Sequence, residues 1–262
     1  MRIFDTHAHF DDEAFDADRY SLIEEMLKGG NRIMNVGSSI ETSITSVELA
    51  GKYDRVYAAV GVHPDEVDCL TESGLTPLKN LIREHPDKIK AVGEIGLDYF
   101  EHEKGERTPE VKLLQKKWFR EQLLLSGECD LPVIIHSRDA AKDTYDILKQ
   151  CGFPKGVIHC YSYSPDMAVQ FVHEGYYLGF GGAITFKSAK RNVESVKAVG
   201  LDHIVIETDC PYMAPEPVRG TRNSSLNLPY VIKKLAEITG ASEQEVSEIT
   251  YRNALDLYRI SD

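Results

Sequence analysis

Eight short apolar runs, each followed by a longer amphipathic segment, recur along the 262-residue chain. The runs are rich in β-branched and other apolar residues, as β-strands are. They span residues 2–7, 32–38, 56–63, 89–98, 131–137, 156–162, 176–182 and 203–210. Strands that alternate with helices pair in parallel, and eight such units close a barrel. The pattern therefore predicts an α/β fold, a (β/α)8 TIM barrel. An open doubly wound sheet is the alternative, but no glycine-rich phosphate loop follows the first run.

Two of the intervening segments carry clear helix-boundary signals. Pro109 stands at the first position of a helix predicted over 110–126, and Gly127 follows its end. Ser242 and Glu245 form a capping-box pattern, which predicts a further helix through about residue 258. Because this helix follows the eighth run, we expect the barrel to carry an extra helix at its C-terminal end.

The composition limits which classes of protein this chain can belong to. No linker or low-complexity tract interrupts the sequence, so we predict one domain over residues 1–262. The formal net charge of −12 argues against a broad nucleic-acid-coating surface, although bound cations can supply positive charge locally. The five cysteines form no CxxC pair, and no signal segment or membrane-spanning run is present. We therefore expect a reduced, cytoplasmic protein, a monomer without a membrane or an obligate protein partner.

Most of the histidines fall where predicted strands end. Those at strand ends are His7, His9, His63, His136 and His159, whereas His85, His102, His173 and His203 have ordinary positions on helices, in a loop and at a strand start. Glu94 closes the fourth predicted strand and Asp209 the eighth. In a TIM barrel the carboxyl ends of all strands meet at one face, where active sites lie. We therefore expect these imidazoles and carboxylates to converge there.

Such a cluster suits divalent metal ions. Each residue alone has an ordinary interpretation as a loop hydrogen-bonding group or a cap, but gathering unpaired imidazoles and carboxylates together is costly. Metal ions offset that cost. The six candidate ligands are His7, His9, Glu94, His136, His159 and Asp209. These are too many for one catalytic zinc, so the cluster predicts two divalent cations, with Zn, Mn, Fe or Mg compatible. Glu94 is the natural bridge between them, and Asp209 could also accept a proton from the attacking water.

Other polar residues near the cluster receive supporting roles. Asp5 and Glu207 lie two residues before His7 and Asp209, so each is interpreted as a buried carboxylate that orients an imidazole or simply makes hydrogen bonds. Cys160 and Cys210 directly follow proposed ligands and should point away from them. We interpret both cysteines as packing residues and not as thiolate ligands.

The ordered motifs "DTHAHF", "GVHP", "VGEIGLDY", "IIHSRDA", "GVIHCYS" and "ETDCPYMAPEPVRGTRN" resemble those of the TatD family of metal-dependent deoxyribonucleases, which lies among the amidohydrolase-like metallo-barrels. The resemblance runs from residue 3 to about residue 258. It implies one metal at His7, His9, Glu94 and Asp209, and a second at Glu94, His136 and His159. It also implies hydrolysis of DNA phosphodiesters, often from the 3′ end. His63 matches a family position near the substrate phosphate or the metals.

The sequence departs from the family pattern after "RGTRN". Members commonly continue with Glu-Pro and Tyr-Val, whereas this chain continues "SSLNLPYV" over 224–231, in the predicted loop after the eighth strand. The departure leaves the candidate ligands intact and bears on substrate range. Arg138 and Arg222 are rim cations that either hold phosphates or are solvated loop residues.

Three functions are compatible with these residues. The first is a two-metal deoxyribonuclease with DNA as substrate. The second is a small-molecule metal hydrolase of amidase, lactonase or phosphotriesterase type on the same barrel, which the acidic net charge favours. In several such enzymes a modified lysine bridges the metals from the fourth strand, and Glu94 at that position favours the nuclease by resemblance. The third, a binding module without catalysis, has no need of so complete a ligand set.

Overall fold

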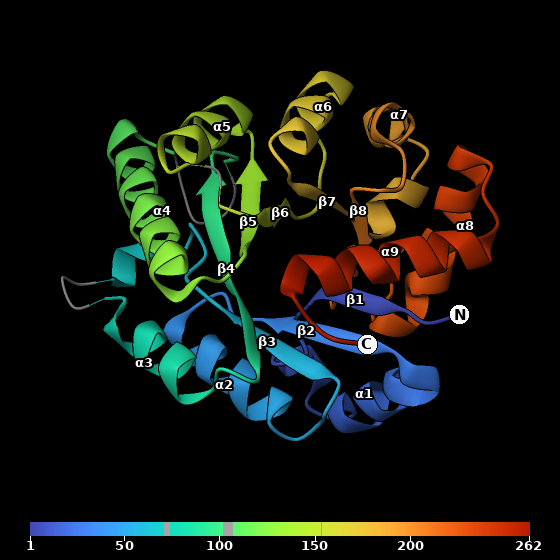
Figure 1. Cartoon of the computed structure of the whole chain (residues 1–262), viewed down its shortest axis with the longest axis horizontal. Helices are drawn as coiled ribbons and strands as arrows, with labels where there is room; N and C mark the ends of the chain where they lie inside the picture. Colours follow the sequence, from blue (N-terminus) through green and yellow to red (C-terminus); the bar gives the residue numbers. More distant parts are fainter. Residues whose placement is uncertain (71–73, 102–106, 153) are drawn as a thin grey trace.

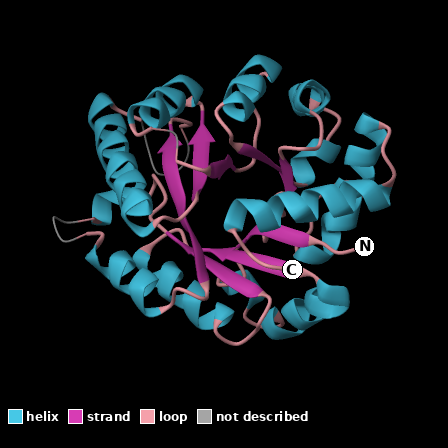
Figure 2. Cartoon of the chain, in the orientation of Figure 1, coloured by secondary structure: helices cyan, strands magenta, loops and turns pink. Residues whose placement is uncertain are grey.

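Eight parallel strands form one sheet in sequence order, and helices surround it (Figures 1 and 2). The computed structural model describes residues 1–70, 74–101, 107–152 and 154–262, so His102 lies outside the described residues. The strands are β1 (Phe4–Ala8), β2 (Arg32–Val36), β3 (Val56–Val60), β4 (Ile89–Asp98), β5 (Val133–Arg138), β6 (Gly156–Ile158), β7 (Tyr177–Phe180) and β8 (Ile204–Ile206). The predicted (β/α)8 fold is confirmed.

The sheet closes just beyond the ends of its first and last strands. Ala8 and Cys210 form a parallel bridge, and the backbone N–H of His9 donates to the carbonyl oxygen of Cys210 at 2.9 Å. The N–H of Asp209 donates to the carbonyl oxygen of His7, also at 2.9 Å. Closure therefore passes directly through residues of the candidate site.

The helices surround the strands, and the last of them packs against the barrel interior. They are α1 (Arg19–Leu27), α2 (Ile40–Ala50), α3 (Thr76–Glu84), α4 (Pro109–Cys129), α5 (Ala141–Gln150), α6 (Pro165–His173), α7 (Lys190–Val199), α8 (Leu228–Thr239) and α9 (Glu243–Tyr258). Short 3-10 turns occur at η1 (Glu13–Phe15), η2 (Lys28–Gly30), η3 (Val67–Cys69), η4 (Gly182–Thr185) and η5 (Ser225–Asn227). In the described part of the chain, no helix is both long and apolar enough to cross a membrane.

One predicted helix boundary is wrong. Gly127 does not end α4, because the helix continues to Cys129 and ends at Asp130, which adopts the left-handed conformation with φ of 51°. Leu125 and Ser126 are buried in this last turn, and the Ser126 hydroxyl donates to the carbonyl oxygen of Leu131 at 2.9 Å. Packing and this hydrogen bond outweigh the cost of an interior glycine, which is about 1 kcal/mol.

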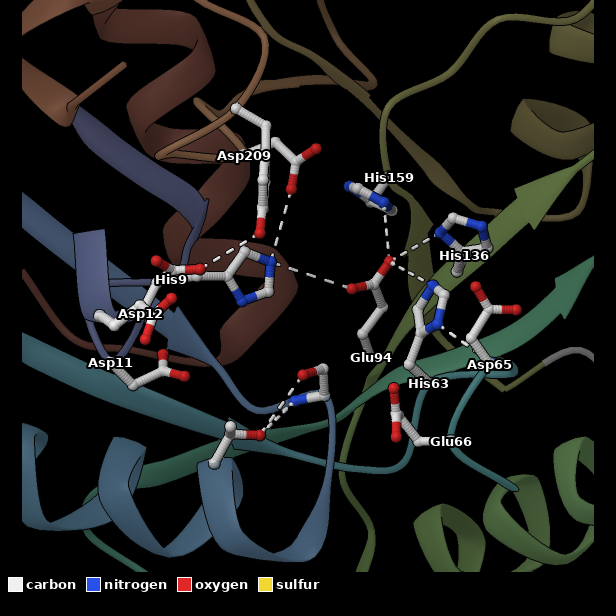
Figure 3. Close-up of a pocket in the computed structure, with 14 residues that line it drawn as sticks. His9, Asp11, Asp12, His63, Asp65, Glu66, Glu94, His136, His159 and Asp209 are labelled. Atoms are coloured by element: carbon white, nitrogen blue, oxygen red, sulfur yellow. Dashed lines mark hydrogen bonds and ion pairs between the residues drawn. The ribbon is translucent and has the colours of Figure 1, made fainter. Parts of the chain in front are cut away.

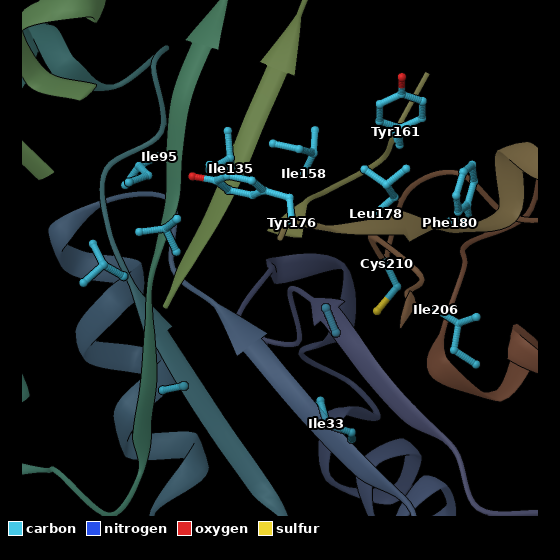
Figure 4. Close-up of a cluster of buried hydrophobic side chains, with 14 of the residues drawn as sticks. Ile33, Ile95, Ile135, Ile158, Tyr161, Tyr176, Leu178, Phe180, Ile206 and Cys210 are labelled. Carbon is cyan, nitrogen blue, oxygen red and sulfur yellow. The ribbon is translucent and has the colours of Figure 1, made fainter. Parts of the chain in front are cut away.

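Alternate residues of each strand face two different apolar layers. In β3, Val56, Ala58 and Val60 belong to the layer between strands and helices, whereas Tyr57 and Ala59 belong to the barrel interior. Figure 4 shows the outer layer, with Ile33, Ile135 and Leu178 among its members. This alternation is the period-two pattern of a strand that is buried on both faces.

The extra C-terminal helix, α9, closes the barrel at the amino ends of the strands. Its Tyr251, Leu255 and Tyr258 pack with interior residues such as Phe4, and the Tyr258 hydroxyl donates to the carbonyl oxygen of Thr6 at 3.2 Å. In Figure 1 α9 crosses in front of the strands. The carboxyl ends, where the candidate ligands lie, remain the open mouth.

Candidate metal centre at the carboxyl ends of the strands

A cavity of about 460 Å³ opens at the carboxyl ends of the strands. Its lining includes five of the six predicted ligands and His63 (Figure 3). The sixth ligand, His7, is fully buried, and its Nε2 atom lies 3.1 Å from His9 Nε2. His7 and His136 lie within β1 and β5, whereas His9 and His159 follow the ends of β1 and β6. The structure thus brings together every residue predicted to bind metal.

Glu94 does not lie at a strand end as predicted, because β4 continues for four further residues to Asp98. Its carboxylate nevertheless lies between two groups of imidazoles. Oε1 is 2.8 Å from His136 Nδ1 and 2.9 Å from His159 Nε2. Oε2 is 3.5 Å from His7 Nε2 and 4.0 Å from His9 Nε2. One carboxylate therefore faces both ligand groups, as a bridging residue must.

Asp209 completes the group around His7 and His9. Its Oδ1 is 3.4 Å from His9 Nε2 and 3.8 Å from His7 Nε2, and these two imidazole nitrogens are 3.1 Å apart. Asp209 has a positive φ of 56°, a conformation that aspartate tolerates better than most residues. Its backbone hydrogen bond to His7 holds this strained position, which turns the carboxylate into the cavity.

The outer ring nitrogens of His9 and His136 each meet a hydrogen-bond acceptor, whereas the outer Nδ1 of the buried His7 meets none among the described residues. His9 Nδ1 is 2.8 Å from the carbonyl oxygen of Val36, and a carbonyl can only accept. In a neutral ring Nδ1 therefore carries the proton and Nε2 presents a lone pair to the cavity. His136 Nε2 lies 3.1 Å from Asp98 Oδ2, which assigns the lone pair to the inner Nδ1 in the same way.

His159 follows the same pattern through Glu207. The Nδ1 atom of His159 is 3.4 Å from Glu207 Oε1, and the inner Nε2 faces Glu94. Lone pairs and carboxylate oxygens that point at one another repel unless protons or cations lie between them. The donor set therefore fits divalent cations, with His7, His9 and Asp209 on one side of Glu94, and His136 and His159 on the other.

The charges of the cluster support each other. Burial raises the pKa of Glu94, but the neighbouring His159, His7 and His63 outweigh it and hold the pKa well below the usual range. Burial lowers the pKa of His9, but the hydrogen bond and charge of Asp209 outweigh it and raise the pKa to about 9. Without metal the carboxylates are ionised and the imidazoles compete for protons. Metal binding would release such protons.

His63 differs from His9 and His136 in that its cavity-facing nitrogen carries a proton. The backbone N–H of Asp65 donates to His63 Nδ1 at 3.2 Å, so this nitrogen is the acceptor and Nε2 carries the proton. Burial, and then His136, lowers the pKa of His63 to about 4, which keeps the ring neutral. Its Nε2 lies 3.9 Å from Glu94 Oε1. His63 thus presents an N–H donor, and not a lone pair, to the cavity.

Of the two supporting carboxylates, only Glu207 contacts an imidazole. It also accepts the Cys160 N–H at 2.6 Å, and Gly179 leaves room for it, because a Cβ there would lie 2.3 Å from Glu207 Oε2. For Asp5 the structure supports the second of its two interpretations, a buried carboxylate that makes hydrogen bonds, one of them from the backbone N–H of His7 at 3.3 Å. Its carboxylate accepts from Thr208 N–H at 3.0 Å and from the hydroxyls of Thr208 and Ser225 at 2.6 Å each, so it ties together backbone segments.

The cysteines next to the ligands behave as packing residues. Cys210 is fully buried within the outer apolar layer. Burial raises the pKa of the Cys160 thiol to about 12, which disfavours the thiolate that metal ligation needs. Among the described residues, the groups of side chains close enough to share a metal contain no cysteine.

The two rim arginines have different surroundings, and neither lines the cavity. The Arg222 guanidinium is held by the Asp18 carboxylate and donates to the carbonyl oxygen of Ala14. Arg138 lies over the ring of Phe100, 3.7 Å from its centroid, and among the described residues it forms no ion pair. Only Arg138 therefore has a charge that is available to a phosphate.

The divergent segment 224–231 is not a loop beside the cavity. It forms η5 and the start of α8, and its Ser225 and Leu228 are buried. None of its residues lines the cavity. The departure from the family pattern therefore changes the support beneath the first metal-binding group, through the Ser225–Asp5 hydrogen bond, and not the cavity wall.

Sequence reasoning missed several acids at the mouth. Asp98 holds His136, and Asp11, Asp12, Asp65 and Glu66 line the cavity. Asp98 shares strand parity with Glu94 in "GEIGLD", a signal that could have identified it. Asp98, His63 and His136 also have ligand atoms within 4.8 Å of one another. Because both histidines present protonated nitrogens there, the trio fits a hydrogen-bonded set better than a third cation site.

Comparison with known proteins agrees with this geometry. The family model for TatD-related DNases matches residues 4–259. The chain belongs to the TatD family. It is 39% identical to the metal-dependent hydrolase YabD of Bacillus subtilis over 262 residues, covering 99% of this chain and 100% of that protein. It is 35% identical to the metal-dependent hydrolase TatD of Mycobacterium tuberculosis, covering 97% of each.

A solved structure of the family has the same fold. The TatD homologue YjjV of Escherichia coli K12 superposes with a TM-score of 0.90 at 30% identity, covering 99% of this chain and 98% of that one. An organophosphorus hydrolase superposes with a TM-score of 0.61 at 12% identity, a likeness that shows the shared barrel alone. Metal-dependent hydrolysis is thus the chemistry common to this TatD-family chain's named relatives.

Proposed function

We propose that this TatD-family hydrolase is a deoxyribonuclease that hydrolyses DNA phosphodiester bonds from the 3′ end, as a monomer with two divalent cations. The observation that supports it most strongly is Glu94, whose Oε1 lies near His136 and His159 and whose Oε2 lies near His7. A paired site of this kind suits in-line displacement at phosphorus, because both the attacking and the leaving oxygen need stabilisation. The family description, TatD-related DNase, names the same substrate.

The residues would hold the cations in two groups. His7, His9 and Asp209 serve one group, His136 and His159 the other, and Glu94 serves both. When bound, the cations supply Lewis-acid activation of water and neutralise charge on the phosphodiester.

The protein's own groups do the rest. Burial raises the pKa of Asp209, but its hydrogen bond to His9 and the charges of His159 and His7 outweigh it and lower the pKa. The carboxylate is therefore ionised at neutral pH and can accept the proton that the attacking water loses. The His63 Nε2–H donates to a phosphate oxygen, where negative charge grows in the transition state.

An acidic mouth favours a second candidate, a small-molecule hydrolase of amidase, lactonase or phosphotriesterase type. Seven carboxylates line the cavity, and they repel a polyanion such as DNA unless cations are bound. A neutral ester or lactone would not meet this repulsion. DNA therefore requires cations bound at the mouth of the cavity to offset this repulsion, whereas a neutral substrate does not.

One experiment separates the candidates. Metal-reconstituted protein is given 3′-labelled single- and double-stranded DNA, and in parallel a panel of amides, lactones, esters and phosphotriesters, across a series of Zn, Mn and Mg. We expect DNA cleavage that Asp209→Asn and Glu94→Ala both abolish. Cleavage that survives both substitutions would indicate a contaminating nuclease. Turnover of a small substrate without any turnover of DNA would overturn the proposal.

A further inference from the structure

A lysine-lined groove is formed by the segment from η4 through α7 together with one residue of α8. In Figure 1 α7 and α8 are neighbouring helices, and they pack on each other. The volume of the groove is about 350 Å³. Lys187, Lys190, Lys197 and Lys234 line it, with Glu194 as the one lining carboxylate. We name this surface the lysine groove. Four ammonium groups against one carboxylate give it a local excess of positive charge, although the whole chain carries −12.

The charges of the lysine groove are largely unneutralised. Lys187, Lys190 and Lys197 are exposed, and among the described residues none of them forms an ion pair. Lys234 pairs with Glu237 at 3.3 Å. The groove therefore attracts anions from solvent, because little of its charge is satisfied within the protein.

The start of α7 adds to this attraction. Its first turn contains Lys190 and Arg191 and no acid, and Ala189 before it supplies no capping side chain. Most helices place acids there, as α9 does with Glu243 and Glu245, because the helix dipole is positive at that end. Cations at the start of α7 oppose the dipole, and a bound anion would relieve that repulsion.

The lysine groove is continuous with the rim of the metal centre. The segment after β8 contains Asp209, carries the exposed Tyr212 on the cavity wall, and then packs onto η4. A Cβ at Gly182 would lie 1.9 Å from the Met213 carbonyl oxygen, and the Glu216 N–H donates to the Thr185 hydroxyl at 2.8 Å. Phe186 and Lys187 directly follow η4, so one surface leads from the cavity to the lysines.

Aromatic groups accompany the charges along this surface. Tyr212 is 57% exposed at the cavity, and Phe186 lines the lysine groove with the Arg219 guanidinium 4.2 Å from its ring centroid. Single-stranded nucleic acids are bound by this combination, in which cations follow the backbone and aromatic rings stack on bases. Lys190 and Lys197 are two helical turns apart on one face, about 10 Å along the axis, so they can serve different phosphates of one strand.

We propose that the lysine groove holds the phosphates of a nucleic-acid strand whose end lies in the metal centre. This inference rests on the proposed nuclease function and explains how an acidic protein retains a polyanion. The metals neutralise the phosphate at the reacting end, whereas the lysines hold the strand several nucleotides away. The groove should therefore matter for long strands and not for short ones.

The test compares two triple variants with the same change in net charge. Lys187→Glu/Lys190→Glu/Lys197→Glu alters the lysine groove. Lys28→Glu/Lys52→Glu/Lys149→Glu alters exposed lysines at or just beyond the carboxyl ends of α1, α2 and α5, none of which lines the lysine groove. Both are made in an Asp209→Asn background, so that the probe is not cleaved. Thermal melting verifies that each variant is folded.

Fluorescence anisotropy then measures binding of 5′-fluorescein single-stranded DNA of about 16 and about 4 nucleotides. For the longer strand we expect the groove variant to lose at least about tenfold in affinity, with a salt slope smaller by about 2. We expect the control variant to change by less than about twofold, and the shorter strand to show little difference. Equal losses in both variants would overturn the proposal. So would displacement of the strand by a polyglutamate peptide as readily as by unlabelled DNA, because the occupant would then be an acidic protein segment.

Cleavage assays with intact Asp209 separate failure of this inference from failure of the proposed function. If the lysines are needed for DNA binding but the unmodified protein does not cleave DNA, the proposed nuclease function is overturned and the proposed binding groove stands. If the groove variant cleaves and binds DNA as well as the unmodified protein, the binding role of the lysine groove is overturned and the nuclease function stands. Hydrolysis of bis(p-nitrophenyl) phosphate, which is too small to reach the groove, should be the same in both triple variants.

Discussion

The metal centre and the lysine groove have opposite charges on neighbouring parts of one barrel. Seven carboxylates line the cavity at the strand ends, whereas four lysines and one carboxylate line the groove between α7 and α8. The carboxylates can face an anionic substrate only when cations are bound to them, whereas the lysines attract anions directly. Under the proposed function this difference separates two tasks, because one region would act on a single phosphate and the other would attract a longer anion.

The largest expected effect comes from removing the residue that faces both groups of imidazoles. Glu94→Ala should lower kcat for DNA about 10³-fold and reduce the metal content of reconstituted protein, because neither group keeps its shared carboxylate. Initial rates and elemental analysis measure the two effects. Glu13→Ala is the matched control, because Glu13 lines the cavity but is exposed. A Glu94→Ala protein with full metal content and activity would contradict the bridging role.

Replacing the N–H donor of the cavity should have the next largest effect. His63→Ala should lower kcat/KM about 10²-fold, the usual cost of losing one donor to a developing negative charge. Metal content should stay unchanged, since the His63 nitrogen that faces the cavity carries a proton. Elemental analysis beside steady-state kinetics separates the two roles. Loss of a metal ion in this variant would show that His63 is a ligand.

A smaller effect is expected from the carboxylate behind His136. Asp98→Asn keeps the size of the side chain but removes the charge that orients the ring, so metal affinity should fall about tenfold. Competition with a fluorescent chelator measures the affinity directly. As a comparison, Glu13→Gln changes an exposed acid that lines the same cavity. An Asp98→Asn protein that binds metal as well as the unmodified protein would exclude the orienting role.

The smallest effect distinguishes the two rim arginines. Arg138→Ala should raise KM for DNA about fivefold and reduce the salt slope by about 1, because its charge is free to meet a phosphate. Arg222→Ala should change KM by less than about twofold, since Asp18 and the Ala14 carbonyl already hold its guanidinium. Steady-state kinetics over a salt series measures both. A larger effect at Arg222 would reverse this assignment.

Local patterns identified most of the fold and the ligands. Eight apolar runs predicted eight strands, because a strand buried on both faces needs a continuous apolar sequence. His7, His9, His136, His159 and Asp209 were identifiable because they follow or end such runs. Asp98 was missed although it lies at a strand end, and Gly127 misled the helix boundary because burial of Leu125 and Ser126 outweighs its local preference.

The sequence by itself determined the barrel and the kinds of donor at its mouth, because hydrophobic periodicity and strand ends are local properties. Only the tertiary structure decided which nitrogen of His9, His63, His136 and His159 faces the cavity. Their partners Val36, Asp65, Asp98 and Glu207 come from separate segments of the chain. The tertiary structure likewise decided that Asp18 forms an ion pair with Arg222, and that lysines of α7 and α8 line one groove. These features depend on contacts between distant residues, which no local pattern records.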